Sequence, residues 1–304
     1  MRLASIDIGT NSVKLLIADF QNGNINNVLI ERPIITRLGQ GVNETGELTT
    51  EAMSRTLKVL GDFKAECESL GVQKIVAVAT SAMRDASNRD IFLQDFADQI
   101  GVSLQIASGD EEAELTFIGT CSDPALRSKK LLLVDVGGGS SEFISGENGI
   151  IENRFSINTG CVRLTEEFLH SDPVDSLELQ KVFQKLIPLL YGHLSKIYME
   201  DRELVGVGGT ITTLAAIHQE LDEYNSNSIQ GYVLQKEDIV RLLTYLKRMT
   251  LEERRKVKGL PPQRADVIVA GAAIFSTIME ILKSREIIIS TRGLRYGALL
   301  KAEK

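Results

Sequence analysis

A short glycine-rich pattern occurs twice in this chain and constrains its fold more than any other feature. The first copy, at residues 6–12, reads Ile-Asp-Ile-Gly-Thr-Asn-Ser, and the second, at residues 134–142, reads Val-Asp-Val-Gly-Gly-Gly-Ser-Ser-Glu. In both copies an apolar strand leads to an aspartate and then to glycine and hydroxyl residues, and a second apolar strand follows. We therefore predict two β-hairpins, each with a polar tip.

The residues of these tips suit the binding of an anion. Glycine lets the backbone turn tightly and direct its N–H groups at an anion, and the hydroxyls of Ser12 and Ser140 add donors. Asp7 and Asp135 can each hold a metal ion or a water molecule beside the anion. Taken alone, each copy is more typical of an ordinary glycine-rich hairpin.

The spacing of the two copies favours a duplicated phosphate-binding loop. Asp7 and Asp135 lie 128 residues apart, and a serine follows each at the same offset. A repeat of this length in a chain of 304 residues indicates two domains of similar fold. We place them at residues 1–124 and 125–290, and we expect a final helix at about 291–304 to return to the first domain.

Other nucleotide-binding motifs do not occur. Neither loop has the G-x-G-x-x-G pattern of dinucleotide-binding folds, and the chain has no G-x-x-x-x-G-K-[ST] sequence. The net charge is −7, the chain has no tryptophan, and no basic run with interleaved aromatic residues occurs, which excludes a typical nucleic-acid-binding protein. Because an acidic surface repels a phosphorylated substrate, we expect a divalent metal ion to take part.

The cysteines and the apolar segments predict a cytoplasmic protein with no membrane anchor. Three widely spaced cysteines, Cys67, Cys121 and Cys161, are typical of a reducing compartment and of core packing. The longest apolar stretch, residues 265–282, contains two acidic residues and is predicted to be a buried helix rather than a membrane span.

Between the two loops, helices and strands alternate. A helix is predicted at residues 50–70, and a buried strand at 75–79. Thr80, Ser81 and Arg84 follow this strand at the carboxyl edge of the predicted sheet, where ligand-binding groups gather in α/β folds. Helix capping is the alternative role for the two hydroxyls.

A strand at 102–107 leads to a capping box of Ser108 with Glu111, and Glu112 then lies in the first helical turn. The helix macrodipole favours a carboxylate at this place and should keep Glu112 ionised. The alternative to a functional role is that these acids only stabilise the start of the helix.

A third glycine-rich turn follows a strand at 204–207. Gly208, Gly209 and Thr210 open a helix there, and backbone amides at a helix start can receive a phosphate. An ordinary strand-to-helix turn is the alternative. A last strand is predicted at 286–290, followed by a helix from Arg292 onward.

Six motifs in this order resemble the exopolyphosphatase and guanosine pentaphosphate phosphohydrolase (Ppx/GppA) family over essentially the whole chain. They are Asp-Ile-Gly-Thr-Asn-Ser at 7–12, Thr-Ser-Ala-Met-Arg at 80–84, Ser-Gly-Asp-Glu-Glu-Ala at 108–113, Asp-Val-Gly-Gly-Gly-Ser-Ser-Glu at 135–142, Gly-Gly-Thr at 208–210 and Leu-Pro-Pro-Gln-Arg-Ala-Asp at 260–266. The third and the last are much more specific than the others, which actin, sugar kinases and heat-shock chaperones share.

The resemblance implies a fold and an activity. The fold is α/β, with two ribonuclease-H-like domains of the actin-like superfamily and an active site in the interdomain cleft. The activity is magnesium-dependent hydrolysis of a terminal phosphoanhydride, and the oligomer is a homodimer.

The resemblance also assigns roles to residues. Glu112 matches the catalytic glutamate that deprotonates the attacking water, and Arg84 matches a phosphate-binding arginine of the catalytic group. Asp135 and Glu142 match acidic residues that serve the metal ion, and Asp7 could assist from the other loop. The positions that line the phosphate path are Asn11, Ser12, Thr80, Ser81, Gly138, Gly139, Ser140, Gly208, Gly209, Thr210 and Arg264.

Four functions are weighed at this point. Exopolyphosphatase activity is the leading hypothesis, because a chain with only 5% aromatic residues offers few surfaces for stacking a base. Hydrolysis of guanosine pentaphosphate is the alternative, and a binding-only sensor or an actin-like kinase belongs to another class.

The chain departs from the family pattern at three places. Thr291 and Tyr296 stand where family members carry acidic residues, and Lys14 after the first loop could touch phosphate or face solvent. The sequence also stops at residue 304, without the C-terminal helical domain of long members, so we expect polyphosphate to be held less processively.

Overall fold

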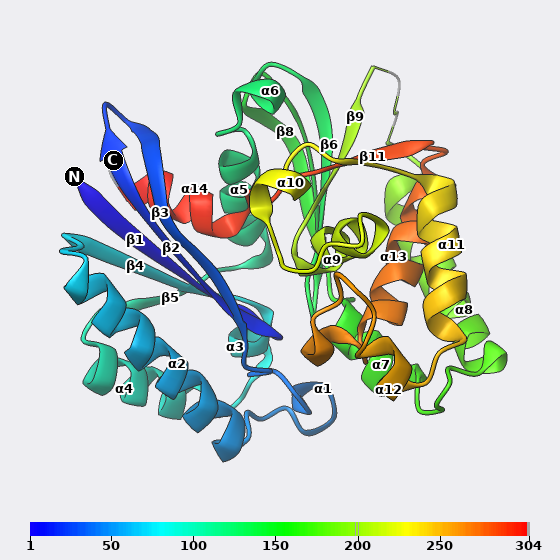
Figure 1. Cartoon of the computed structure of the whole chain (residues 1–304), viewed down its shortest axis with the longest axis horizontal. Helices are drawn as coiled ribbons and strands as arrows, with labels where there is room; N and C mark the ends of the chain where they lie inside the picture. The colour runs from blue at the N-terminus through cyan, green and yellow to red at the C-terminus, as the bar shows by residue number, and fades with distance from the viewer. Residues whose placement is uncertain (198, 200, 303–304) are drawn as a thin grey trace. The chain divides into compact units, whose positions relative to one another are not determined.

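The computed structural model describes residues 1–197, 199 and 201–302, which form two compact units. Unit 1 comprises Met1–Arg127, Arg154–Ser156 and Arg292–Lys304, and unit 2 comprises Ser128–Asn153 and Ile157–Thr291. Each is an α/β unit built on one mixed β-sheet (Figure 1).

The sheet of unit 1 has five strands in the order β3-β2-β1-β4-β5. The strands are β1 (Arg2–Ile8), β2 (Ser12–Gln21), β3 (Asn24–Ile35), β4 (Lys74–Ala79) and β5 (Leu104–Ile106). The first three form an antiparallel meander, and β4 and β5 continue parallel to β1. The carboxyl ends of three neighbouring parallel strands therefore meet at one edge of the sheet, where α/β folds place their ligands.

Helices cover both faces of this sheet (Figure 1). The helices of unit 1 are α1 (Val42–Thr45), α2 (Thr50–Ser69), α3 (Ser81–Asp85), α4 (Arg89–Ile100), α5 (Gly109–Thr120), α6 (Pro124–Arg127) and α14 (Leu294–Ala302). Alternate residues of β1 face opposite sides. Ile6 and Ile8 join a core with α2 and α4, whereas Leu3 packs with Tyr296 and Leu299 of α14.

Unit 2 repeats the antiparallel meander and then extends it differently. Its strands, in the order β10-β11-β9-β6-β7-β8, are β6 (Lys130–Val136), β7 (Ser141–Glu147), β8 (Ile150–Ile157), β9 (Glu203–Val207), β10 (Val233–Gln235) and β11 (Glu286–Ile289). Its helices are α7 (Cys161–Phe168), α8 (Ser176–Leu194), α9 (Gly209–His218), α10 (Ser226–Ile229), α11 (Lys236–Lys247), α12 (Leu251–Arg254) and α13 (Ile268–Ile281), with a 3₁₀ turn at Pro262–Arg264.

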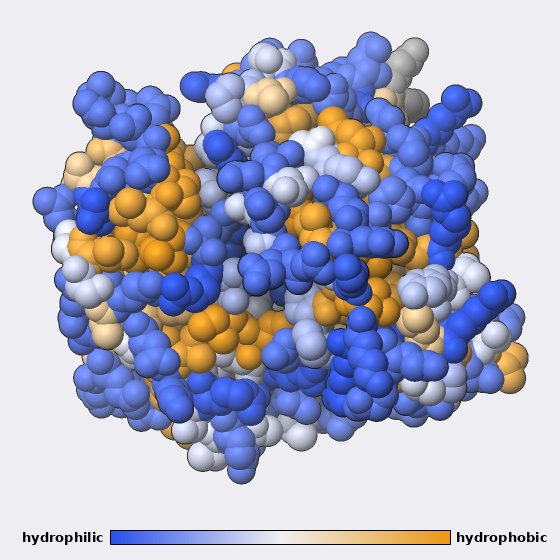
Figure 2. Space-filling model, in the orientation of Figure 1, coloured by the Kyte–Doolittle hydropathy of each residue, from blue (hydrophilic) through white to orange (hydrophobic). Residues whose placement is uncertain are grey.

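Helix α13 is the central helix of unit 2. It packs against α7, α8, α9 and α11, and its side chains are almost all buried. No helix within the described residues is long and apolar enough to cross a membrane. Polar side chains cover most of the face drawn in Figure 2, with small apolar areas between them.

Most predicted elements are present, and the differences have local causes. The predicted helix at 50–70 is confirmed as α2, and Thr49 caps it by accepting the N–H of Ala52 at 3.2 Å. The long apolar helix begins at Ile268 rather than at residue 265, because the 3₁₀ turn precedes it. Strand β5 is shorter than predicted, and the last helix begins at Leu294. The predicted residues 303–304 of this helix lie outside the described part of the chain.

The two residues that replace acidic residues of the family pattern, Tyr296 and Thr291, have structural roles. Tyr296 is only 4% exposed and fills the core between α14 and β1, with the guanidinium of Arg292 5.6 Å from its ring centroid. Thr291 donates its hydroxyl to Oε1 of Gln230 at 2.9 Å and its N–H to the same atom at 2.8 Å. Tyrosine therefore replaces a charge with apolar packing at this position.

Helices α5 and α14 cross in direct backbone contact. A Cβ atom at Gly297 would lie 1.8 Å from the carbonyl oxygen of Leu115, and one at Gly119 would lie 2.1 Å from that of Gly293. Only glycine permits this approach, so α5 is held against the sheet by α14 from the far end of the chain.

We predict that Gly297→Ala destabilises the protein by about 1–3 kcal/mol or more, because the backbone of one helix must move away from the other. Gly61→Ala in α2 is the matched control, since nothing lies within 4 Å of its added Cβ. It should stabilise the helix by about 0.4–1 kcal/mol. Urea unfolding of both variants, followed by circular dichroism, measures the difference; equal midpoints would refute the close-contact interpretation.

Candidate functional site

The first glycine-rich tip, between β1 and β2, is closed by its own backbone. The N–H of Gly9 donates to the carbonyl of Ser12 at 3.0 Å, and the N–H groups of Thr36 and Arg37 donate to the carbonyl of Asn11 at 3.1 and 3.0 Å. Because neighbouring segments take up these loop carbonyls, the tip is held in one conformation. Asn11 and Ser12, two predicted phosphate-binding residues, are each 6% exposed there.

The second tip, between β6 and β7, repeats this construction. The N–H of Gly137 donates to the carbonyl of Ser140 at 3.0 Å, which matches the first tip. The start of α7 takes up the loop carbonyls: Cys161 donates to Gly137 at 3.0 Å and Val162 to Gly138 at 2.9 Å. The predicted duplication is therefore present at the level of individual hydrogen bonds.

The predicted acidic residues of unit 2 lie on one hairpin. Asp135 and Glu142 are directly opposed across β6 and β7, so both side chains project from the same face. Glu142 is 1% exposed, and Oδ1 of Asp135 lies 2.3 Å from where a Cβ of Gly208 would be. Gly208, at φ +93°, thus lets the third glycine-rich turn approach the carboxylate.

Arg264 lies against this third turn. A Cβ at Gly209 would lie 2.3–2.5 Å from the guanidinium atoms of Arg264, so the guanidinium covers the start of α9. Arg264 is 8% exposed, and this burial lowers its pKa from the ordinary arginine value. In the described part of the chain no carboxylate lies within ion-pair distance of it. The hydroxyl of Thr210 donates to the carbonyl of Val136 at 3.4 Å. The structure therefore brings the predicted residues of unit 2 together.

In unit 1, Glu112 and Arg84 form an ion pair. Nη1 of Arg84 donates to Oε2 of Glu112 at 2.7 Å and to the carbonyl of Ala107 at 2.8 Å. Both side chains are largely buried, with 11% exposure for Glu112 and 19% for Arg84. A charge-assisted bond of this length orients the carboxylate.

The neighbouring acid, Glu111, has the capping role that the sequence predicted. Its carboxylate accepts the N–H of Ser108 at 2.8 Å, and the hydroxyl of Ser108 accepts the N–H of Glu111 at 3.2 Å. These bonds hold the pKa of Glu111 below its ordinary value. The capping box is confirmed, and Glu112 is not part of it.

Thr80 and Ser81 are buried at the end of β4, next to the first tip. The N–H of Thr80 donates to the carbonyl of Ile8 at 3.1 Å, but its side chain makes no capping bond to α3. The hydroxyl of Ser81 donates to Asp85 at 3.4 Å. Capping by Thr80, the alternative reading of this residue, is therefore wrong.

Asp7 differs from the other predicted metal-binding residues. Its Oδ2 accepts a hydrogen bond from Nζ of Lys14 at 2.7 Å, and its side chain is 4% exposed. A lysine ammonium, rather than solvent, is thus the close cation of this carboxylate.

The residues of unit 2 fit a magnesium ion. Within the described residues no group of three or more His, Cys, Asp or Glu side chains could hold a metal ion. Magnesium does not need such a group, because it binds through one or two carboxylates together with phosphate oxygens and water. The opposed pair Asp135 and Glu142 therefore offers a suitable donor set.

Two structural contributors were missed by sequence reasoning. Gly39 donates its N–H to the carbonyl of Thr10 at 2.9 Å, and a Cβ there would lie 2.5 Å from the side chain of Thr10. Gly160 approaches Gly138 in the same way, with its Cβ position 2.4 Å from the carbonyl oxygen. In the sequence, only the presence of a glycine after the third strand of each meander could have indicated these close contacts.

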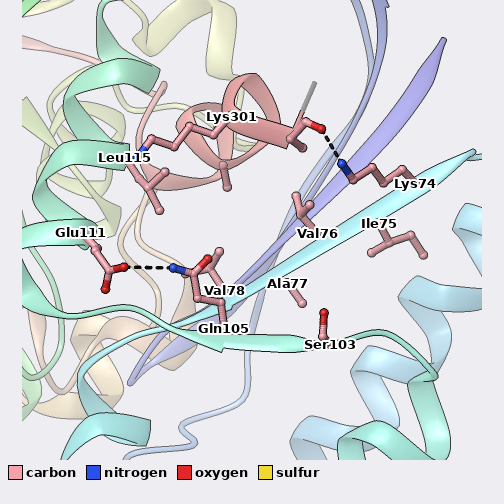
Figure 3. A pocket seen from close by; sticks show the side chains of 12 residues that line it. Lys74, Ile75, Val76, Ala77, Val78, Ser103, Gln105, Glu111, Leu115 and Lys301 are labelled. Carbon is pink, nitrogen blue, oxygen red and sulfur yellow. Dashed lines mark hydrogen bonds between the residues drawn. The ribbon is translucent and has the colours of Figure 1, made fainter. Parts of the chain in front are cut away.

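A pocket of about 310 Å³ in unit 1 contains none of the predicted residues (Figure 3). It is lined by residues of β4 and by Ser103 and Gln105 on one side and by residues of α5 and α14 on the other, and both of its lysines are engaged. Nζ of Lys74 donates to the carbonyl of Ala302 at 2.5 Å, and Lys301 pairs with Glu114. The pocket is therefore not part of the candidate catalytic site.

Comparisons with known proteins identify the family. The profile described as the Ppx/GppA phosphatase family matches residues 16–304. The chain is 36% identical over 294 residues to exopolyphosphatase 2 of Mycobacterium tuberculosis, covering 93% of this chain and 92% of that protein.

Solved structures show the same architecture. The Ppx/GppA family member of Aquifex aeolicus is 34% identical, with a TM-score of 0.82 and coverage of 100% of this chain and 97% of that one. An exopolyphosphatase from Cytophaga hutchinsonii is 28% identical, with a TM-score of 0.89 and coverage of 99% and 98%. They confirm that the chain has the α/β fold of this family, built here on two mixed sheets. The chain belongs to the Ppx/GppA phosphatase family and is, by that membership, a phosphoanhydride hydrolase.

Proposed function

We propose that this protein is an exopolyphosphatase, which hydrolyses the terminal phosphoanhydride of inorganic polyphosphate and releases orthophosphate. The observation that carries the proposal is the buried ion pair of Glu112 and Arg84 in unit 1. The similarity to proteins named exopolyphosphatase over 93% or more of the chain supports the choice of substrate.

Glu112 is the proposed general base. Its carboxylate would accept a proton from a water molecule as the water oxygen bonds to the terminal phosphorus. The bond from that phosphorus to the bridging oxygen breaks, and the products are orthophosphate and a chain shorter by one phosphate. General base catalysis of this kind contributes about 10²–10⁴-fold to the rate.

Arg84 is proposed to link the base to the substrate. A guanidinium carries five N–H donors, and the two on Nη1 are directed at Glu112 and Ala107. The guanidinium is planar and rigid, so a phosphate that contacts it would be fixed in position relative to the base. Positioning and charge neutralisation are the main requirements of phosphoryl transfer.

In unit 2, Asp135 and Glu142 are proposed to hold magnesium, which would neutralise charge on the phosphate oxygens. Arg264, with the backbone amides of the glycine-rich turns, would bind the rest of the phosphate chain. The lowered pKa of the buried Arg264 supports this role, because a bound anion would compensate for lost hydration.

We predict metal-dependent phosphate release from long polyphosphate by the purified protein. Release should be abolished by a chelator and restored by Mg²⁺, with less release from tripolyphosphate, guanosine pentaphosphate and ATP assayed in parallel. A preference for guanosine pentaphosphate would replace the proposed substrate with the nucleotide, and no release from any compound would favour a binding-only sensor.

We predict that Glu112→Gln lowers kcat by about 10²–10⁴-fold with little change in KM, because the amide can still accept the bond from Arg84 but cannot accept a proton. Glu111→Gln is the matched control one residue away. It should cost about 0.3–1.5 kcal/mol of stability through the weakened capping box and leave kcat within a few-fold. Steady-state kinetics and urea unfolding test both variants. Unchanged kcat in Glu112→Gln would refute the assignment of the base.

A further inference from the structure

The pocket of about 310 Å³ in unit 1 is lined by none of the residues assigned above to catalysis, phosphate or metal. Its walls come from β4, α5 and α14 and from residues 103 and 105 (Figure 3). We call it the β4–α14 pocket. Pockets for small molecules begin at about 300 Å³, so this one has room for a small ligand.

The floor of the β4–α14 pocket is apolar. Val78, Leu115 and Ala298 belong to one small core cluster of unit 1, and the half-buried Val76 packs against that cluster. All four residues also line the pocket, so its floor is the outer side of the cluster. An apolar group placed there would gain contacts with the cluster and remove the exposed part of Val76 from water.

The charged residues of the pocket favour an anion. They are Lys74, Lys301 and Glu111, which give the lining a net charge of +1 in a chain whose net charge is −7. Lys301 is paired with Glu114. Nζ of Lys74 donates to the carbonyl of Ala302 at 2.5 Å, and an ammonium has three N–H donors, so Lys74 can also donate to a ligand.

Glu111 sets the direction of such a ligand. Its carboxylate accepts the N–H of Ser108 at 2.8 Å and a bond from Nε2 of Gln105 at 3.3 Å. The bonds with Ser108 lower the pKa of Glu111, so its carboxylate stays ionised and repels a second anion. Figure 3 shows Glu111 and Lys74 on opposite sides of the pocket. The anionic group of a ligand therefore belongs at the Lys74 side.

We propose that the β4–α14 pocket is a second ligand-binding site of this protein, which takes a small amphipathic monoanion such as a medium-chain carboxylate. The carboxylate of the ligand accepts hydrogen bonds from the ammonium of Lys74, and the alkyl chain lies on the apolar floor. The inference does not depend on the proposed substrate, because the pocket shares no residue with the catalytic or phosphate-binding groups.

A ligand in this pocket contacts the helix that bears the proposed base. Glu111 and Leu115 lie one turn apart on α5, so both face the pocket. The carboxylate of Glu112 is bonded to Arg84 instead. The ligand therefore ties α5 to β4 without touching Glu112.

Calorimetry with probes of equal chain length tests the chemistry of the ligand. Octanoate should bind the full chain at one site, more tightly than octan-1-ol or octylammonium. Lys74→Gln should weaken octanoate binding by about tenfold or more, because the amide can still donate to Ala302 but carries no charge. Lys58→Gln, at an exposed position of α2, loses the same charge and should bind octanoate as the wild type does. The proposal is overturned if octanoate does not bind, if the alcohol or the amine binds as tightly, or if Lys74→Gln has no effect.

Filling the pocket tests where the probe binds. Ser103 is an exposed lining residue, so Ser103→Phe should occupy the pocket and abolish octanoate binding. Ser54→Phe makes the same change at an exposed position of α2 and should leave binding intact. Urea unfolding checks that both variants fold, and Lys74→Gln decides the question if Ser103→Phe does not. Full affinity in folded Ser103→Phe, or competitive displacement of octanoate by tripolyphosphate, would refute the assigned site.

Hydrogen exchange tests the contact with α5. Bound octanoate should slow the exchange of the α5 backbone amides in the wild type and in Ser54→Phe, but not in Ser103→Phe. Slower exchange only in other helices, or in none, would contradict the proposed contact.

Discussion

The register of two antiparallel hairpins, β1 with β2 and β6 with β7, decides where the polar groups at the tip of each hairpin lie. In each hairpin one backbone bond, from Gly9 to Ser12 or from Gly137 to Ser140, closes the tip at 3.0 Å. A shift of one residue in either register would turn the aspartate and its opposed partner to the other face of the sheet. The buried apolar residues that alternate with them, such as Ile6 and Ile8, oppose such a shift because they would lose their core.

Around these tips, close backbone approaches assemble segments that are distant in sequence. Gly39 lies against Thr10, Gly160 against Gly138, and Gly209 against Arg264, each at a distance that excludes a side chain on the glycine. The crossing of α5 and α14 at Gly297 works in the same way and positions the helix that bears Glu112. These glycines let backbone and side chains of distant segments pack closely around the candidate residues, which suits a reaction that depends on positioning.

The two adjacent acids at the start of α5 illustrate how local and tertiary effects divide. Glu111 satisfies the backbone of its own helix, as its spacing from Ser108 predicts. Glu112 turns toward Arg84, which is 28 residues away in sequence and lies on another helix. Lys14 behaves similarly, because its pairing with Asp7 follows from strand register rather than from any local preference.

The sequence alone determined the duplicated loops, most of the order of helices and strands, the capping box and the family, because these depend on local periodicity, turn residues and short motifs. It left open whether Glu112 does more than stabilise the start of α5, what Lys14 contacts, and why Tyr296 can replace an acidic residue. Tertiary structure decided these points, since each depends on which distant segment packs against the residue: Arg84 for Glu112, Asp7 for Lys14, and the strands β1 and β2 for Tyr296. Electrostatic partners and core packing act through space, and the spacing of residues along one chain does not contain those distances.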